Sequence, residues 1–180
     1  ILSIDNPIQP VWIGGNQIHG YAMSLALSDS YAYVACHFGG LQILDASTPQ
    51  SPVQVGGYRG SSGYARSVST IGSRAYVSDD SAGLQIVDVS DPVSPVRLGN
   101  YEQPGCGIAA HAVVRGKYAY IPYGSGGLLI LDVTDSAHPV KVGEYSRSMF
   151  AQAVAIADHY AYVATQEAGP GYQAGLVILD

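Results

Sequence analysis

The chain has 180 residues, of which 47% are hydrophobic and only 12% charged, with 22 Gly, 10 Pro and 14 Tyr. This composition excludes a disordered chain, because disordered segments are rich in charge and poor in aromatic and β-branched residues. The formal net charge of -6 comes without any run of Lys or Arg, which excludes nucleic acid as a partner because its recognition depends on clustered cations.

Three sequence markers recur along the chain in one register, which is the signature of a repeat protein. An apolar hexapeptide that begins with Gly and ends in Asp occurs at residues 40–45, 83–88, 127–132 and 175–180. A segment of the type Tyr-Ala-Tyr-Val occurs at residues 31–34, 74–77, 118–121 and 160–163. A Pro-Val pair with Gly three residues after the Val starts at Pro10, Pro52, Pro95 and Pro139. The sequence therefore predicts four copies of a unit of about 43 residues, the spacing of the first two hexapeptides.

The periodicity within a unit is that of β-strands. In residues 63–104 we predict strands at 65–71, 74–78, 84–89 and 96–101, with a tight turn at Gly72 and Ser73 between the first two. The third strand is an almost unbroken apolar run, which indicates burial on both faces. No segment keeps the 3.6-residue period of a helix over the ten or so residues that a helix needs. Four short antiparallel strands in each repeated unit predict an all-β fold, the β-propeller, with one blade for each unit.

The apolar third strands also carry a family resemblance. Leu84-Gln85-Ile86-Val87-Asp88 and Leu176-Val177-Ile178-Leu179-Asp180 resemble the LVIVD repeat of bacterial and archaeal surface and secreted proteins. The flanking Ala-Tyr-Val and Asp-x-Ser-x-Pro elements also fit that repeat, and the resemblance covers the whole chain. It implies a propeller of roughly six to eight blades and an extracellular or cell-surface location. It implies no particular chemistry.

We interpret residues 1–180 as one β-propeller domain or segment. Its predicted parts are a partial blade at 1–16 that supplies a third and a fourth strand, blades at 20–58, 63–104 and 108–146, and a last blade at 149–180 that lacks its own fourth strand. The chain starts and ends in the middle of a repeat and has neither an initiator Met nor a basic leader, so we expect a mature or excised piece of something longer.

How the ring closes stays open at this stage. Residues 8–16 would complete the last blade of a closed four-bladed ring, but residues 1–5 would then be a surplus third strand. We prefer a slice of a larger ring, or closure by a second copy. An open slice exposes apolar blade faces, and exposed patches of that size indicate a partner.

Residues that every unit carries are predicted to be structural. Aspartates end the third strands at Asp45, Asp88 and Asp132, and Asp5 is placed in the same position at the N-terminus. Each is followed by a turn, and Asp and Ser side chains hydrogen-bond the backbone of their own turns. Cys36 and Cys106 have no partners at metal-ligand spacing. Two free thiols are our preferred interpretation, with a disulfide between them as the alternative.

Candidate binding residues are those that differ between units. In the first strands the variable positions are Met23, Arg66, His111 and Gln152. The loops between second and third strands, which open on the same rim of a propeller, contribute His37, Asp79, Asp80, Tyr123, Glu167 and Tyr172. Loops on a rigid scaffold are where binding residues concentrate. We predict a polar funnel, with Arg66 and His111 as hydrogen-bonding or anion-binding groups and Tyr123 and Tyr172 as apolar walls. The alternative is that these side chains face only solvent or channel water.

The predicted function is a non-catalytic extracellular or cell-surface module that binds a protein or glycan, or assembles with further copies of itself. No nucleophile elbow, metalloprotease helix or phosphate loop occurs, and residues 79–81 lack the ligand spacing of a calcium loop, so we predict no catalytic residue, no metal and no cofactor. No apolar run reaches the roughly 20 residues of a membrane span. The alternatives are an enzyme that acts on a small molecule or sugar at the funnel, where Asp79 or Asp80 would face Glu167, and a purely structural segment of a large protein or filament.

Overall fold

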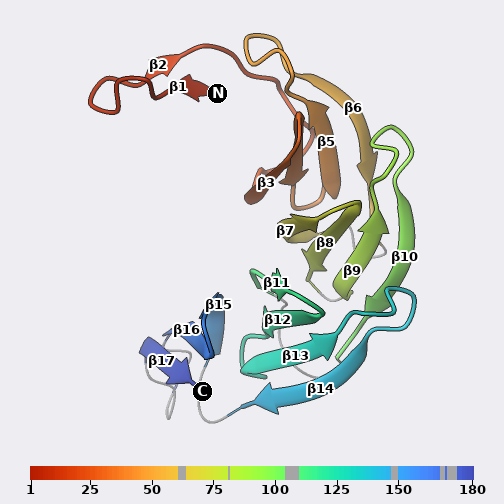
Figure 1. The fold of residues 1–180 in the computed structure, drawn as a ribbon, viewed down its shortest axis with the longest axis vertical. Helices are drawn as coiled ribbons and strands as arrows, with labels where there is room; N and C mark the ends of the chain where they lie inside the picture. Colours follow the sequence, from red (N-terminus) through yellow and green to blue (C-terminus); the bar gives the residue numbers. More distant parts are fainter. Residues whose placement is uncertain (61–63, 81, 104–109, 147–149, 167–168, 170–173) are drawn as a thin grey trace.

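The computed structural model describes the chain except for residues 61–63, 81, 104–109, 147–149, 167–168 and 170–173. The described residues form β-strands and turns, and none of them belongs to a helix. The strands are grouped into small sheets that follow one another along an open arc (Figure 1). The part of the chain that is described contains no helix long and apolar enough to cross a membrane.

Each unit of the repeat is one antiparallel sheet, the blade of a β-propeller. Blade 1 consists of β3 (Ser24–Ser28), β4 (Tyr31–Ala35), β5 (Leu41–Asp45) and β6 (Val53–Tyr58). Blade 2 consists of β7 (Ala65–Ile71), β8 (Arg74–Asp79), β9 (Gly83–Asp88) and β10 (Val96–Tyr101). Blade 3 consists of β11 (Val113–Arg115), β12 (Tyr118–Pro122), β13 (Leu128–Asp132) and β14 (Val140–Tyr145). Blade 4 has three described strands, β15 (Phe150–Ala157), β16 (Tyr160–Gln166) and β17 (Gly175–Leu179).

The strand order within each blade follows the chain, so every neighbouring pair is a hairpin. The first strands β3, β7, β11 and β15 lie on the concave side of the arc, and β6, β10 and β14 lie on its outer side (Figure 1). In blade 2 the predicted strand bounds agree with the observed ones to within one residue. The prediction of an all-β propeller with four-stranded blades is thereby confirmed.

The core lies between the blades, because each sheet presents apolar side chains on both faces. In β9, Leu84 and Ile86 pack with blade 3, whereas Val87 packs with blade 1, and all three are 0% exposed. Successive side chains of a strand point to opposite faces, so one apolar run serves two interfaces. Burying such a side chain fully is worth about 1.5–3 kcal/mol. The predicted burial of the third strand on both faces is therefore confirmed, and the reason is the neighbouring blade on each side.

Polar contacts join the first strands of neighbouring blades. Ser67 Oγ accepts a hydrogen bond from the backbone nitrogen of Ala112 (3.3 Å) and donates one to the carbonyl oxygen of Ala110 (3.3 Å). At the preceding junction Ser24 Oγ accepts a hydrogen bond from the backbone nitrogen of Val68 at 3.4 Å. These bonds satisfy backbone groups that would otherwise be buried without partners, and so they fix how adjacent blades align.

The turn aspartates are structural. Oδ1 of Asp45 accepts a hydrogen bond from the backbone nitrogen of Ser47 at 2.8 Å, and Asp88 accepts one from Ser90 at the same distance. The hydrogen bonds from Ser47 hold the pKa of the Asp45 carboxyl below its usual value. Asp132 repeats the pattern with Thr134. The side chain thus replaces a backbone acceptor in the turn.

The N-terminal hairpin corrects one prediction. β1 (Leu2–Ser3) pairs with β2 (Val11–Trp12), and Ser3 lies opposite Val11 as Asp45 lies opposite Val53. Ser3, not Asp5, therefore occupies the place of the turn aspartate, and its Oγ accepts a hydrogen bond from the backbone nitrogen of Asp5 at 3.4 Å. The misassignment of Asp5 has a simple cause. An apolar residue before an Asp imitates the end of a third strand, whereas the distance to the following Pro-Val pair fixes the register.

The glycine of three of the four Pro-Val-x-x-Gly segments lies under the next blade. A Cβ on Gly14, Gly56 or Gly99 would overlap backbone carbonyl oxygens of the turn between the third and fourth strands of the following blade, those of Pro49, Pro92 and Ser136 respectively. Gly143 has no such neighbour, and a Cβ there would meet only the Ile130 side chain at 3.5 Å. The missing Cβ at the first three positions is thus what allows adjacent blades to approach closely.

We expect Gly56→Ala to lower the free energy of unfolding by about 2–4 kcal/mol, because backbone cannot move aside as a side chain can. Gly143→Ala is the matched control, and we expect it to change that free energy by less than about 0.5 kcal/mol. Urea unfolding followed by circular dichroism, at a concentration low enough for the chain to be monomeric, measures both. Equal losses for the two variants would contradict this explanation of the glycine.

Cys36 is a free thiol that is 0% exposed, and it packs with Val34, Leu44 and Ile18. The interpretation of Cys36 as an unpaired thiol is confirmed, whereas Cys106 lies outside the described residues. Burial raises the pKa of the Cys36 thiol to about 11. Because the thiolate is the nucleophile, the native thiol should be inert.

We expect iodoacetamide at pH 8 to alkylate Cys36 only after the protein is unfolded. A rise in pKa from 9.0 to about 11 lowers the thiolate fraction about 100-fold, and burial also excludes the reagent. Peptide mass spectrometry of native and urea-treated samples measures the modification at Cys36. Rapid alkylation of Cys36 in the native protein would contradict the expected protection, because it would show that the packing around the thiol opens readily.

Candidate functional site

The variable first-strand residues lie in or just before β3, β7, β11 and β15, the strands on the concave side of the arc (Figure 1). Met23 is 50% exposed, and His111 and Gln152 are also exposed. The backbone of His111 forms a parallel bridge to Ala153 of blade 4, so this position is held at a blade junction. The structure therefore leaves the side chains of Met23, His111 and Gln152 accessible to solvent.

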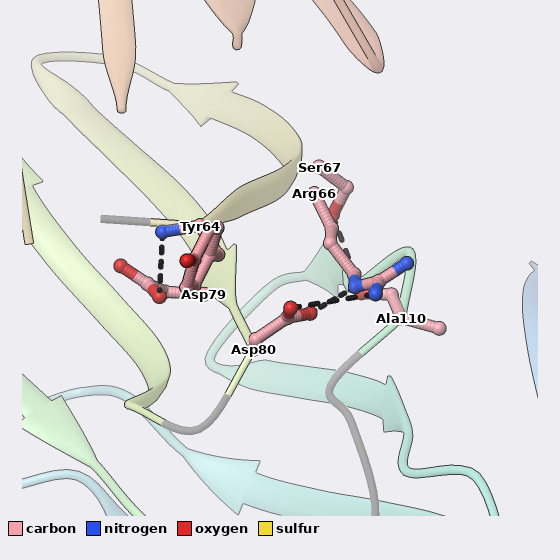
Figure 2. Close-up of polar contacts among 6 residues, drawn as sticks. All are labelled: Tyr64, Arg66, Ser67, Asp79, Asp80 and Ala110. Atoms are coloured by element: carbon pink, nitrogen blue, oxygen red, sulfur yellow. Dashed lines mark hydrogen bonds and ion pairs between the residues drawn. The ribbon is translucent and has the colours of Figure 1, made fainter. Parts of the chain in front are cut away.

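Arg66 and Asp80, two of the predicted rim residues, are joined in the structure as an ion pair. Nε of Arg66 donates to Oδ1 of Asp80, and Nη2 donates to Oδ2 at 3.3 Å, so the guanidinium holds both carboxylate oxygens (Figure 2). Both side chains are partly exposed, at 33% and 19%. Two parallel bonds fix the orientation of the guanidinium. The Arg66 guanidinium is thus a partly exposed donor of fixed orientation.

Asp79 is a structural carboxylate and not a surface ligand. It is 1% exposed, and Oδ1 accepts a hydrogen bond from the backbone nitrogen of Tyr64 at 3.3 Å (Figure 2). A Cβ on Gly60 would overlap its other carboxylate oxygen. Asp79 therefore braces the connection between blades 1 and 2, and it differs from Asp80 because adjacent residues of a strand end point in opposite directions.

Tyr123 is likewise buried, at 2% exposure, in the core between blades 2 and 3. It occupies the position that Cys36 and Asp79 occupy in blades 1 and 2, and all three point inward. The prediction of Tyr123 as an apolar wall of the funnel is therefore corrected, because the first position of this loop belongs to the core. Glu167 and Tyr172, also predicted at the rim, lie outside the described residues.

His37 is half-buried and joins two blades. Its backbone nitrogen donates to the carbonyl oxygen of Ala65 at 2.8 Å, and the nitrogen of Ala65 donates back at 2.9 Å. The backbone of His37 has a positive φ of 44°, which is uncommon outside glycine. This pairing places the His37 ring between the loop of blade 1 and the start of blade 2.

Around His37 lies a group of rings that we call the rim aromatic cluster, made of His19, Tyr21, His37, Phe38 and Tyr64. The centroids of Tyr21 and Phe38 are 5.3 Å apart in an edge-to-face arrangement. His37 lies 4.8 Å from Tyr64 and 5.9 Å from Phe38, and His19 lies 5.4 Å from Phe38. Tyr21 is 67% exposed and Tyr64 43%. Sequence comparison of the units predicted only His37 here, although Phe38 follows it in the same divergent loop.

A polar hollow of about 420 Å³ adjoins this cluster. His19, Gln42, Gln54, Tyr58 and Arg59 line it together with two glycines. Gln54 Nε2 donates to Gln42 Oε1, Gln42 Nε2 donates to the Gly39 carbonyl at 2.5 Å, and Arg59 Nη2 donates to the Phe38 carbonyl at 2.6 Å. His19 and Arg59 thus link the polar hollow to the rings. The combined surface offers amide, guanidinium and phenol groups beside exposed aromatic faces.

The described residues contain no group of three or more His, Cys, Asp or Glu side chains placed to hold a metal ion. Of the carboxylates considered for sugar hydrolysis, Asp79 is buried and Asp80 is paired with Arg66. The described rim offers hydrogen-bonding groups, exposed rings and the charged pair of Arg66 and Asp80.

Three solved structures with a similar fold have low sequence identity to this chain. The computationally designed Ika4 protein is 7% identical with a TM-score of 0.72, over 91% of this chain and 92% of that one. The designed Ika8 protein is 9% identical with a TM-score of 0.63, over 81% and 44%. BamB from Moraxella catarrhalis is 17% identical with a TM-score of 0.59, over 80% and 44%. At these identities the likeness shows the fold alone.

This chain thus spans less than half the length of Ika8 and of BamB. None of the curated proteins matches it. The family comparison is decisive. The model of the LVIVD repeat matches residues 19–59, 62–103, 106–147 and 150–180, which together make up most of the sequence. The chain therefore belongs to the LVIVD repeat family.

Proposed function

We propose that this chain is a non-catalytic binding module and that a neutral glycan is the ligand class that fits its rim. The observation that carries the proposal is the rim aromatic cluster with its adjoining polar hollow. We also propose an extracellular or cell-surface location, as the likeness to the repeat of surface and secreted proteins implies.

The exposed rings supply flat apolar contact area. Edge-to-face packing holds Tyr21 and Phe38 against each other, so little side-chain freedom is lost when a ligand lies on them. Tyrosine combines an apolar ring with a hydroxyl group, which suits a sugar with both C–H faces and hydroxyl edges. An exposed aromatic group on a rigid scaffold indicates binding rather than packing.

The hollow supplies neutral hydrogen-bonding groups beside the guanidinium of Arg59. Gln54 is exposed, and a side-chain amide both donates and accepts hydrogen bonds. Arg59 adds a fixed donor, since one of its nitrogens is already anchored to the Phe38 carbonyl. With 12% charged residues in the whole chain, the surface favours a polar neutral ligand over a charged one.

We expect Tyr21→Ala with Phe38→Ala to weaken glycan binding by at least about 10-fold, because the stacking surface is lost. A glycan array identifies the best ligand for the unmodified protein, and isothermal titration calorimetry compares the variants. Tyr160→Ala is the control, since Tyr160 is as exposed as Tyr64, at 43%, but lies at the start of β16 in blade 4.

Two results would overturn the proposal. One is the absence of any glycan ligand for the folded protein, and the other is an equal loss of affinity for the Tyr160→Ala control. If the Tyr21 and Phe38 substitutions instead abolish binding to a purified protein partner while no glycan binds, the rim is a protein-binding surface and the glycan proposal is wrong.

A further inference from the structure

The two ends of the arc expose the two halves of an interface that the chain builds three times internally. Inside the chain, one face of each third strand packs on the blade that follows, and the opposite face packs on the blade that precedes. We call the free face of blade 4 the tail face and the free face of blade 1 the head face. The arc is open, and its ends do not meet (Figure 1).

The tail face shows the side chains that elsewhere cover the next blade. Leu176 and Ile178 of β17 are 63% and 56% exposed. Their equivalents in β9, Leu84 and Ile86, are both 0% exposed because blade 3 lies over them. Isolated exposed apolar residues are normal, but two at successive same-face positions of a strand make a patch.

The head face shows the complementary side chains. Leu25 is 59% exposed, although its equivalent in blade 2, Val68, is 2% exposed under blade 1. A hollow of about 830 Å³ lies over this face and is lined mainly by apolar groups, among them Met23, Leu25, Leu27 and Val34. This is the place that the strands of a preceding blade would fill.

A second half-interface lies on the outer side. Gly14, Gly56 and Gly99 each lie under the turn of the following blade, whereas Gly143 does not. A groove of about 610 Å³ runs beside Gly143, between blade 3 and β17. At the other end of the chain, the turn that contains Pro7 and the strand β2 extend outward, with Ile8 88% exposed and Trp12 72% exposed. By equivalence with Pro49 and Pro92, Pro7 carries the carbonyl that would lie over Gly143.

We propose that two copies of this 180-residue chain associate head to tail and close one ring through two identical junctions. At each junction the tail face of one copy lies on the head face of the other, as blade 1 lies on blade 2 within the chain. Strand β2 of one copy supplies the fourth strand beside β17 of the other. In the single chain, residues 1–3 lie beside β2. In the dimer, residues 178–180 of the other copy take their place. This inference does not depend on the glycan proposal.

The occupant is a second copy because both surfaces repeat an interface that this sequence already makes. The two faces differ, so the contact is heterologous, and a heterologous contact forms a ring when its rotation closes. Each blade has its own hydrogen-bonded sheet, so the junction needs no refolding beyond the exchange of β1 for β17 beside β2.

Sedimentation velocity of the 180-residue chain at about 10 µM is expected to show one species of twice the chain mass. Leu176→Asp on the tail face and Leu25→Asp on the head face should each raise the dimer dissociation constant about 100-fold or more, since each buries a charge in an apolar contact. Val96→Asp is the matched control, because Val96 is 61% exposed on the outer strand β10, and it should leave the dimer unchanged. Gly143→Ala should weaken the dimer as well, without loss of strand structure by circular dichroism.

Mixing the two charged variants gives the sharpest test. Neither associates alone, but the intact tail of Leu25→Asp matches the intact head of Leu176→Asp, so the mixture should recover a dimer held by a single junction. A monomer at all concentrations would overturn the proposal, as would a variant pair in which only one substitution abolishes the dimer. A ladder of larger species from the unmodified chain would show that the junction does not close after two copies, and would overturn it too.

Discussion

Every level of this structure depends on one constraint, which is that each small sheet is apolar on both faces and is buried only by its neighbours. Leu84 and Ile86 face blade 3, Val87 faces blade 1, and none of the three is accessible to water. A four-stranded sheet of this size has no helix or second layer to cover it, so stability comes from stacking, as in other repeat proteins. Apolar burial drives the stacking of the blades. The close approach at Gly56 and the hydrogen bonds of Ser67 then fix how the stacked blades align.

The repeat made much of the fold predictable. The hexapeptide that ends in Asp45, Asp88 and Asp132 marks both the third strand and its turn, and one aligned unit then places the strands of the others. The N-terminal segment was harder, because Ile4 and Asp5 imitate that marker, whereas the pairing of Ser3 with Val11 shows the true register. Which blade faces remain uncovered could not be predicted, since it depends on how the units are arranged in space.

The candidate site was only partly predictable for a related reason. The variable first-strand positions and the divergent loops pointed to Arg66 and Asp80, which the structure joins in an ion pair. Sequence does not say which residue of a loop points inward, and so Asp79 and Tyr123, which are buried, were grouped with exposed neighbours. The aromatic cluster joins residues of three separate segments, 19–21, 37–38 and 64. The close approach of Gly20 to Gly39 brings the first two segments together, and the pairing of His37 with Ala65 brings residue 64 to them.

Interblade burial as the source of stability is tested most directly by one pair of equivalent residues. Ile86 of β9 lies between blades 2 and 3 and is 0% exposed. Ile178 is the equivalent residue of β17 in blade 4, where no blade covers it, and it is 56% exposed. In a Leu25→Asp background, which prevents the head-to-tail junction, Ile86→Ala should lower the free energy of urea unfolding by about 3 kcal/mol and Ile178→Ala by less than about 1 kcal/mol. Equal losses at the two positions would contradict the dependence of each sheet on its neighbours.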